Sequence, residues 1–335
     1  MAVLVTGGTG YIGSHTVVEL IEAGYTPIII DNLINSSEEI LDKIKTITDI
    51  RPKFYKKDLT NIADIEEIFV KEEIDSVIHF AALKAVGESV EKPLEYYKNN
   101  LIGTLNLLEV MKKHHVNNFV FSSSATVYGN PASNPILEEF PLSTTNPYGA
   151  TKLMIEDMLR DMCKVDSSLN VAILRYFNPV GVHKSGLLGE IPNGIPNNLM
   201  PYIIKVATGE LEFLNVFGQD YDTLDGTGVR DYIHVVDLAE GHLRALSKLN
   251  EKVGLVTYNL GTGKGYSVLD LVRAFESVSG VTIPYKVVKR RLGDVAMCYA
   301  NPNKAQEELG WKAKYGINDM CEDSWRWSLK CKSIN

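Results

Sequence analysis

The stretch Val5-Thr6-Gly7-Gly8-Thr9-Gly10-Tyr11-Ile12-Gly13 decides the fold class of this 335-residue chain. It overlaps the apolar run at residues 2–6, which predicts a buried strand, and opens residues 11–23, which predict a helix ended by Gly24. Glycines between a strand and a helix let backbone N–H groups approach a pyrophosphate at the positive end of the helix. The stretch therefore predicts a dinucleotide-binding turn.

Two glycine registers fit this turn, GxxGxxG through Gly7, Gly10 and Gly13, or GxGxxG with Gly8 in place of Gly7. Asp31 ends the next apolar run, about 20 residues further on, where a carboxylate binds the ribose hydroxyls of adenosine. No arginine lies between Gly13 and residue 51 to favour a 2′-phosphate. We therefore expect NAD rather than NADP; the alternative for Asp31 is a strand-end or helix-cap residue.

Apolar runs alternate with helix-length segments through the first half of the chain. Strands are expected at residues 26–31, 53–57, 76–80, 118–122 and 171–176. Near-continuous apolar strands indicate a parallel sheet covered on both faces. The expected fold class is α/β with a doubly wound parallel sheet, and ligands at the carboxyl ends of its strands.

The composition of the sequence and its pattern of apolar runs change after about residue 178. Residues 181–198 are rich in Gly, Pro and Asn, which is typical of a loop or linker. Helices are then expected near 198–208, 235–249, 267–278 and 316–330, with strands near 255–260 and 283–288. We expect an NAD-binding domain at 1–177 and a smaller α/β substrate domain at 178–335, with some return of the chain to the first lobe.

The composition indicates a soluble, cytoplasmic protein. Hydrophobic residues make up 45% and the formal net charge is −8, which argues against a general nucleic-acid surface. No stretch approaches the roughly 18 apolar residues of a membrane span, and the strand pattern from residue 2 leaves no room for a signal segment. The cysteines Cys163, Cys298, Cys321 and Cys331 have no CxxC spacing, so we expect free thiols and no metal site.

A tyrosine and a lysine form the candidate catalytic pair. Residues 144–147 (Thr-Thr-Asn-Pro) predict a helix start, so Tyr148 and Lys152 lie on one helical face. A nearby ammonium, helped by the positive charge of oxidised nicotinamide, brings the phenol pKa down from about 10. This spacing is common by chance, but here the strand at 118–122 runs into three serines, of which Ser124 is the expected hydroxyl partner. Those serines could also simply end the strand.

Five longer motifs resemble those of the UDP-glucose 4-epimerase family, an extended branch of the short-chain dehydrogenases/reductases with a Rossmann-type fold. They are His79-Phe-Ala-Ala-Leu-Lys-Ala-Val-Gly-Glu-Ser89, Phe121-Ser-Ser-Ser-Ala-Thr-Val-Tyr-Gly129, Leu174-Arg-Tyr-Phe-Asn-Pro-Val-Gly181, Asn197-Asn-Leu-Met-Pro-Tyr202 and Asp225-Gly-Thr-Gly-Val-Arg-Asp-Tyr-Ile-His234. The resemblance extends nearly from end to end. It implies reversible C4 epimerisation of UDP-glucose and UDP-galactose through a 4-keto intermediate, with tightly bound NAD, in galactose metabolism.

The resemblance also implies roles for individual residues. Tyr148 would be the acid/base, Lys152 would hold the nicotinamide ribose, and Ser124 would bond the sugar hydroxyl. Besides the glycines and Tyr148 and Lys152, the NAD contacts would be Tyr11, Ile12, Asp31, Asn32, Asp58, Leu59, Phe80, Ala81, Lys84, Asn99 and Phe177. The UDP-sugar contacts would be Lys84, Ser124, Tyr148, Asn178, Asn198, Leu199, Phe217, Arg230, Arg291, Asp294 and Cys298. Arginines suit a diphosphate, although a solvated surface role is the commoner one for any single arginine.

The rivals of epimerisation fall into two classes, other enzymes of the same branch and a noncatalytic NAD-binding protein. Sugar-nucleotide dehydratases of the same branch place an Asp-Glu pair after the active-site hydroxyl, where this chain has Ala125-Thr126, so elimination lacks its acid and base. Decarboxylases of that branch are a related alternative. A noncatalytic NAD-binding regulator would be expected to lose the catalytic residues, and this chain keeps them.

The range of accepted sugars and the oligomeric state are implied by the resemblance only. Family members restricted to glucose and galactose carry a tyrosine four residues after the aspartate that matches Asp294. This chain has Cys298 there and Tyr299 next, as in members that also accept N-acetylhexosamines, so UDP-GlcNAc and UDP-GalNAc are expected substrates. Cys298 could equally be a small core residue. A homodimer through helices near 91–114 and 147–165 is also implied.

Overall fold

A seven-stranded parallel sheet organises the computed structural model, which describes residues 1–190, 196, 198–291 and 293–334. In spatial order the strands are β11 (Leu255–Leu260), β6 (Asn170–Tyr176), β5 (Asn118–Ser122), β4 (Ser76–His79), β1 (Ala2–Thr6), β2 (Thr26–Asp31) and β3 (Lys53–Lys56). Every neighbouring pair runs parallel. Strand order reverses direction at β1, so the predicted doubly wound sheet is confirmed.

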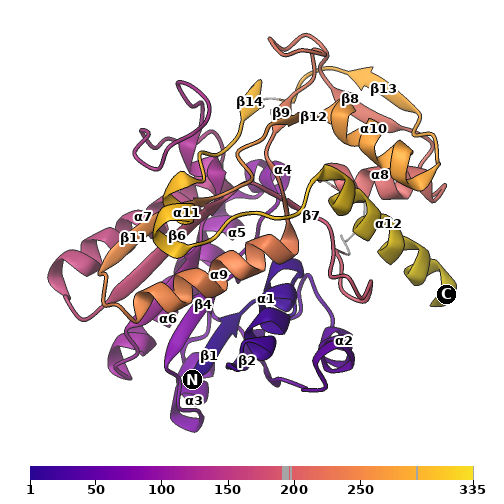
Figure 1. The fold of residues 1–335 in the computed structure, drawn as a ribbon. Coiled ribbons are helices and arrows are strands. Elements are labelled where there is room, and N and C mark those ends of the chain that lie inside the picture. The colour runs from indigo at the N-terminus through magenta and orange to yellow at the C-terminus, as the bar shows by residue number, and fades with distance from the viewer. Residues whose placement is uncertain (191–195, 197, 292, 335) are drawn as a thin grey trace.

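Helices cover both faces of this sheet (Figure 1). One face packs against α1 (Tyr11–Glu22), α2 (Glu39–Thr48) and α9 (Val235–Leu249), the other against α3 (Ile62–Lys71), α6 (Gly103–Lys113) and α7 (Pro147–Val165). Successive residues of β1 point to opposite faces, so Val3 and Val5 enter the first core and Leu4 the second. Burial on both faces explains why the strands have apolar runs instead of alternation.

Short helical segments follow the central strands. After β4 come α4 (Val86–Glu91), α5 (Pro93–Tyr97) and the π-helical turn η1 (Lys98–Ile102), and after β5 comes the 3₁₀ turn η2 (Ala125–Tyr128). Among the residues described, no helix combines the length and the apolar character that crossing a bilayer requires.

A second group of elements lies at the upper right of Figure 1. Its core joins α8 (Leu199–Ala207), α10 (Val268–Ser279) and α12 (Ile317–Ile334) to the parallel pair β8 (Leu214–Phe217) and β13 (Tyr285–Val288). Two smaller sheets lie beside it, β12 (Tyr266–Ser267), β9 (Val229–Arg230) and β14 (Met297–Cys298), and the pair β10 (Tyr232–His234) and β7 (Asn178–Val180). The last helix before α12 is α11 (Asn303–Leu309).

Two elements expected in the second lobe belong to the first. β11 pairs along its whole length with β6, and α9 packs against α1 in the first core. The sequence predicts some return of the chain to the first lobe but not which elements return, because a short apolar run does not reveal which sheet it joins. The return of the chain to the first lobe thus consists of α9, β11 and the adjoining α11.

Candidate active site

The turn between β1 and α1 leaves no space for side chains. A Cβ on Gly13 would lie 2.2 Å from the Gly7 carbonyl oxygen. Gly7 has a φ of +69°, and its Cβ would lie 2.8 Å from the backbone nitrogen of Ala81, after β4. A Cβ on Gly8 would meet the side chain of Ile29 at 2.8 Å and the Val5 carbonyl oxygen at 3.2 Å, and Gly8 has no positive φ. The register through Gly7 and Gly13 is therefore the one that the backbone requires, and it leaves a cradle of bare peptide groups at the start of α1.

The Asp31 carboxylate lies beside this cradle. It accepts hydrogen bonds from the backbone nitrogens of Thr9, at 3.3 Å, and Leu33, at 2.9 Å. Asn32 then donates to Asp58 over 3.0 Å, which ties the end of β2 to the loop after β3. A carboxylate beside a glycine cradle suits an adenosine ribose next to a pyrophosphate, so these residues fit NAD.

The other residues expected at NAD lie along the same edge of the sheet. Asp58 and Leu59 follow β3, Phe80, Ala81 and Lys84 follow β4, Phe177 follows β6, and Asn99 lies in η1. Each comes directly after a strand or in the segment that follows it, where the carboxyl ends of parallel strands meet.

The start of α7 places the tyrosine at this edge. The Asn146 side chain caps the helix by accepting from the Gly149 nitrogen at 2.8 Å, and Pro147 occupies the first helical position. This confirms the helix start that the sequence predicts. Tyr148 therefore lies in the first turn of α7, and Lys152 follows one turn later.

Burial dominates the electrostatics of the pair. Burial raises the pKa of Tyr148 well above its usual range, and a hydrogen bond with the Ser124 hydroxyl lowers it in part. Burial also lowers the pKa of Lys152 to about 7. The Lys152 ammonium donates to the Ser122 carbonyl over 2.8 Å and lies 6.0 Å from the centre of the Tyr148 ring. A second positive charge near the phenol would favour its ionised form, which is the state that removes a proton.

Three consecutive serines meet three residues of α7 that are one turn apart. Tyr148 bonds the hydroxyl of Ser124, Lys152 the carbonyl of Ser122, and Glu156 accepts from the hydroxyl of Ser123 at 2.6 Å. Sequence reasoning missed Glu156. The sequence does contain a pattern that indicates it. Residues 148, 152 and 156 are spaced four apart, which puts a third ionisable side chain on the helix face that packs on the sheet.

The residues expected at UDP gather on the small sheets of the second lobe. Arg230 on β9 lies opposite Cys298 on β14 in the strand register, and one of its nitrogens is 3.7 Å from an Asp294 oxygen. The Arg291 guanidinium lies over the Phe217 ring, 3.9 Å from its centre. The structure thus places Arg230 and Asp294 together at the small sheet and Arg291 at the end of β8.

Cys298 links this group to the large sheet. It packs against a small cluster that contains Tyr128, Ile136, Phe177 and Ala300. Burial raises the pKa of its thiol to about 11, so the residue is a neutral thiol at ordinary pH. Cys298, expected at the sugar, and Phe177, expected at NAD, therefore share one apolar cluster.

Glu190 is a further residue that the sequence did not single out. Its carboxylate is 2.8 Å from the Lys84 ammonium and accepts from the Asn198 side chain at 3.0 Å. It connects a residue expected at NAD with one expected at UDP. Its position in a loop rich in Gly and Pro carries no periodic signal. Asn178 and Leu199, the remaining expected contacts, begin β7 and α8.

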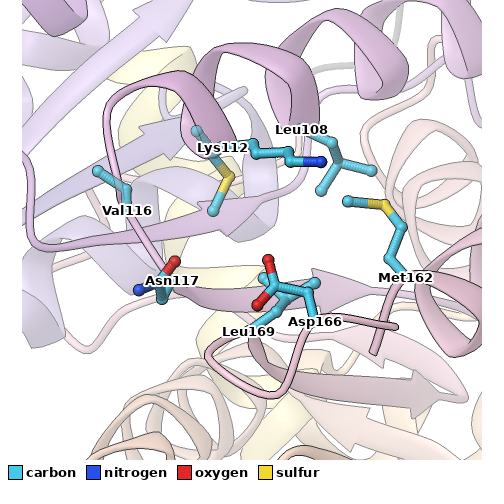
Figure 2. Close-up of a pocket in the computed structure, with 8 residues that line it drawn as sticks. Leu108, Lys112, Val116, Asn117, Met162, Asp166 and Leu169 are labelled. Carbon is cyan, nitrogen blue, oxygen red and sulfur yellow. The ribbon is translucent and has the colours of Figure 1, made fainter. Parts of the chain in front are cut away.

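A small cavity lies at the opposite edge of the sheet. Its volume is about 20 Å³. Leu108, Val116, Met162 and Leu169 line it, near the residues that precede β5 and β6 (Figure 2). That volume holds about one water molecule.

The fold and the site define an extended short-chain dehydrogenase/reductase, with a nucleotide cradle at β1 and a buried Tyr–Lys–Ser constellation at β5. A family model described as GDP-mannose 4,6 dehydratase matches residues 4–324. The UDP-glucose 4-epimerases of Bacillus subtilis and Homo sapiens are 61% and 60% identical, over 98% and 97% of this chain and 96% and 95% of their own. The chain belongs to the UDP-glucose 4-epimerase family.

Solved structures agree with this assignment. The UDP-glucose 4-epimerase of Stenotrophomonas maltophila, with bound NAD and formylated UDP-arabinopyranose, has a TM-score of 0.98 and 48% identity over 100% of both chains. That of Bifidobacterium longum, in complex with NAD+ and UDP, has a TM-score of 0.96 and 56% identity over 98% of both chains.

Proposed function

We propose that this chain interconverts UDP-glucose and UDP-galactose by reversible oxidation at C4, with NAD as a bound cofactor. The observation that carries the proposal is the meeting of Tyr148, Lys152 and Ser124 at the carboxyl end of β5. The residues after Ser124 are Ala125 and Thr126, which begin η2 and supply no carboxylate. The site can therefore move one proton and one hydride, but it lacks the acid and base for elimination.

The proton chemistry follows from the buried pair. The Tyr148 oxygen takes the proton of the C4 hydroxyl, while Ser124 holds that hydroxyl by a hydrogen bond. NAD, when bound, supplies the acceptor and later the donor of hydride at C4. Lys152 stabilises the ionised phenol by its charge, and Tyr148 returns the proton when the 4-keto sugar is reduced. Net redox is zero, so the cofactor stays bound between turnovers.

Inversion requires the 4-keto sugar to present its other face. We propose that the UDP moiety anchors the sugar during this rotation. Arg230 and Arg291 would hold it, because their guanidinium groups suit a diphosphate. Asp294 would accept from ribose hydroxyls. Tight binding of the nonreacting nucleotide permits a loose sugar pocket, and a loose pocket is what rotation of the ring needs.

The alternatives have less support. A dehydratase on this fold needs an acid/base carboxylate pair after Ser124, and η2 supplies no carboxylate. A decarboxylase remains a related alternative that acts on a UDP-sugar with a carboxylate. A noncatalytic NAD-binding regulator has no need of a phenol, an ammonium and a hydroxyl buried together.

We further propose that UDP-GlcNAc and UDP-GalNAc are substrates. Cys298 is a small side chain in the apolar cluster beside Phe177, and its strand partner is Arg230. A small residue at this wall leaves room for an acetamido group that a tyrosine would exclude. The Cys298 side chain is partly buried and neutral, so it offers size and not charge as the selecting property.

A homodimer is the proposed assembly. Apolar side chains are exposed on neighbouring helices after β4 and β5: Val86, Val90, Leu94, Ile102, Leu105 and Met154. Leu94 is 64% exposed and Leu105 49%, and exposed apolar residues gathered on adjacent helices are typical of an interface. Replacing Leu105 and Met154 by glutamate should give a monomer in sedimentation velocity, while Val287→Glu, at an exposed position on β13 in the second lobe, should not. A monomeric unmodified protein would disprove the dimer.

A cytoplasmic location is also proposed. Four free thiols support it, because thiols stay reduced in the cytosol.

One experiment tests the main proposal. The protein is purified, its bound nucleotide is released and identified, and UDP-galactose is added with no cofactor. We expect bound NAD and formation of UDP-glucose. Absence of UDP-glucose when NAD is also supplied would overturn the proposed function.

A further inference from the structure

A buried ion pair lies directly behind the catalytic lysine. Glu156 is fully buried on α7, one turn after Lys152. The Arg175 guanidinium on β6, 2% exposed, bonds both oxygens of the Glu156 carboxylate, at 3.0 and 2.6 Å. Ser123 donates to one of these oxygens at 2.6 Å and Arg160 to the other. All the strong acceptor directions of the carboxylate are thus occupied.

Arg175 is itself held from the far side. Its other terminal nitrogen donates to the Tyr128 hydroxyl and the Glu138 carbonyl, both at 2.9 Å. Tyr128 in turn donates to the Asn259 side chain over 2.6 Å. The ion pair is therefore fixed by β6, β11, α7 and η2 together, and its desolvation cost is met by paired partners.

The geometry connects this pair to the proton chemistry. Ser123, which holds Glu156, lies between the residues that hold Lys152 and Tyr148. Fixing the carboxylate therefore fixes the register of α7 on the end of β5. Burial lowers the pKa of Lys152 to about 7, and the Glu156 carboxylate acts against this. Among the residues that the structure describes, Glu156 is the charge that favours the ammonium form of Lys152.

We propose that Glu156, clamped by Arg175 and Ser123, is a positioning residue that holds Lys152 in place and in its ammonium form. The expected change in kcat rests on the proposed function, whereas the expected change in the Lys152 titration does not. Glu156 touches neither substrate nor cofactor in this scheme; it acts through Lys152. Beside this carboxylate, the ionisable groups around the pair are His79 on β4, Tyr96 on α5, Tyr176 on β6 and, behind Glu156, Arg160 and Arg175.

The test uses Glu156→Gln, which keeps the shape and loses the charge. Because Lys152 loses its supporting charge, we expect the ammonium to deprotonate at lower pH by about one unit or more. The loss of activity on the alkaline side should move by the same amount. At neutral pH, kcat should fall about tenfold or more, with KM for UDP-galactose within about threefold. The lysine is observed directly by carbon NMR of protein labelled at the lysine ε-carbon, with Lys152→Met to assign its signal.

A second variant separates the effect of Glu156 on protein stability from its effect on Lys152. Glu156→Gln alone leaves Arg175 buried and unpaired, which can unfold the protein. Glu156→Gln with Arg175→Gln removes both charges, so thermal stability should recover while the shifted Lys152 titration and the low kcat remain. Glu156→Asp should restore part of both. Asp157→Asn, exposed on the same helix and paired with Arg160, is the matched control and should change neither.

The outcomes distinguish the claims. If the double variant regains stability, kcat and the Lys152 titration together, Glu156 is only structural and the inference fails. If the titration of Lys152 is unchanged in a folded Glu156→Gln, it fails as well. If the unmodified protein does not convert UDP-galactose, the proposed function fails, whereas the Lys152 titration still decides the role of Glu156.

Discussion

Lys152 presents its ammonium nitrogen 6.0 Å from the centre of the Tyr148 ring, one helical turn away, and donates to a strand carbonyl instead of to the phenol. The lysine therefore influences the tyrosine by charge and not by a direct hydrogen bond. The phenol is left to bond the Ser124 hydroxyl and, in the proposed reaction, the sugar. This division of roles makes the contributions of the two residues separable by experiment.

Removing the phenol oxygen should stop the chemistry without disturbing the fold. In Tyr148→Phe we expect kcat for UDP-galactose to fall about 100-fold or more, because the proton acceptor is gone. The ring keeps its packing, so bound NAD and the thermal midpoint should be nearly unchanged. Activity equal to that of the unmodified protein would disprove the role of Tyr148.

Removing the buried ammonium should stabilise the cofactor-free protein, and more so at pH 7 than at pH 9.5. The pKa of Lys152 falls from 10.5 in the unfolded chain to about 7 in the fold. Between these values the unfolded chain binds the additional proton, so the free energy of unfolding rises with pH by about 1.4 kcal/mol per unit. Denaturant unfolding should show the advantage of Lys152→Met shrinking across this window.

The exposed Lys164 on the same helix supplies the control. Its side chain is 72% exposed, so Lys164→Met should show no pH-dependent difference from the unmodified protein. A constant difference between Lys152→Met and the unmodified protein from pH 7 to 9.5 would contradict the burial effect on Lys152.

Much of the first lobe could be predicted because its signal is local. The strands ending at Thr6, Asp31 and Ser122 end where the apolar runs end. The helix start before Tyr148 was equally readable, since the capping side chain and the proline are adjacent in sequence. The position of β11 could not be read, because joining β6 depends on how α9 crosses the sheet.

The parts of the site that sequence reasoning missed depend on contacts between distant segments. The glycine register is decided by the approach of Ala81 to Gly7, which no local pattern shows. The pairing of Glu156 with Arg175 similarly requires α7 and β6 to pack together. Residue types at such positions indicate chemistry, but only the packing shows which partner each one meets.

Adding a methyl group at the cradle should abolish cofactor retention. In Gly13→Ala the new Cβ would lie 2.2 Å from the Gly7 carbonyl oxygen, so the turn must move. We expect the purified variant to carry no nucleotide, judged by the ratio of absorbance at 260 and 280 nm, and to unfold at lower temperature. Gly87→Ala, in α4 with nothing within 4 Å of the new Cβ, should retain nucleotide and be at least as stable. Retention of NAD by Gly13→Ala would contradict the cradle.

The size of residue 298 should decide whether N-acetylated sugars are accepted. In Cys298→Tyr we expect kcat/KM for UDP-GlcNAc to fall about tenfold or more, because the larger side chain takes the space proposed for the acetamido group. The value for UDP-galactose should change much less. Tyrosine adds volume among Tyr128, Ile136 and Phe177. Cys298→Leu therefore serves as a variant of intermediate size, and both variants are compared for thermal stability. Cys298→Ala should retain both activities, since it creates space and removes no charge. Equal losses for the two sugars in Cys298→Tyr would point to general damage of the cluster, and no turnover of UDP-GlcNAc by the unmodified protein would end the hypothesis.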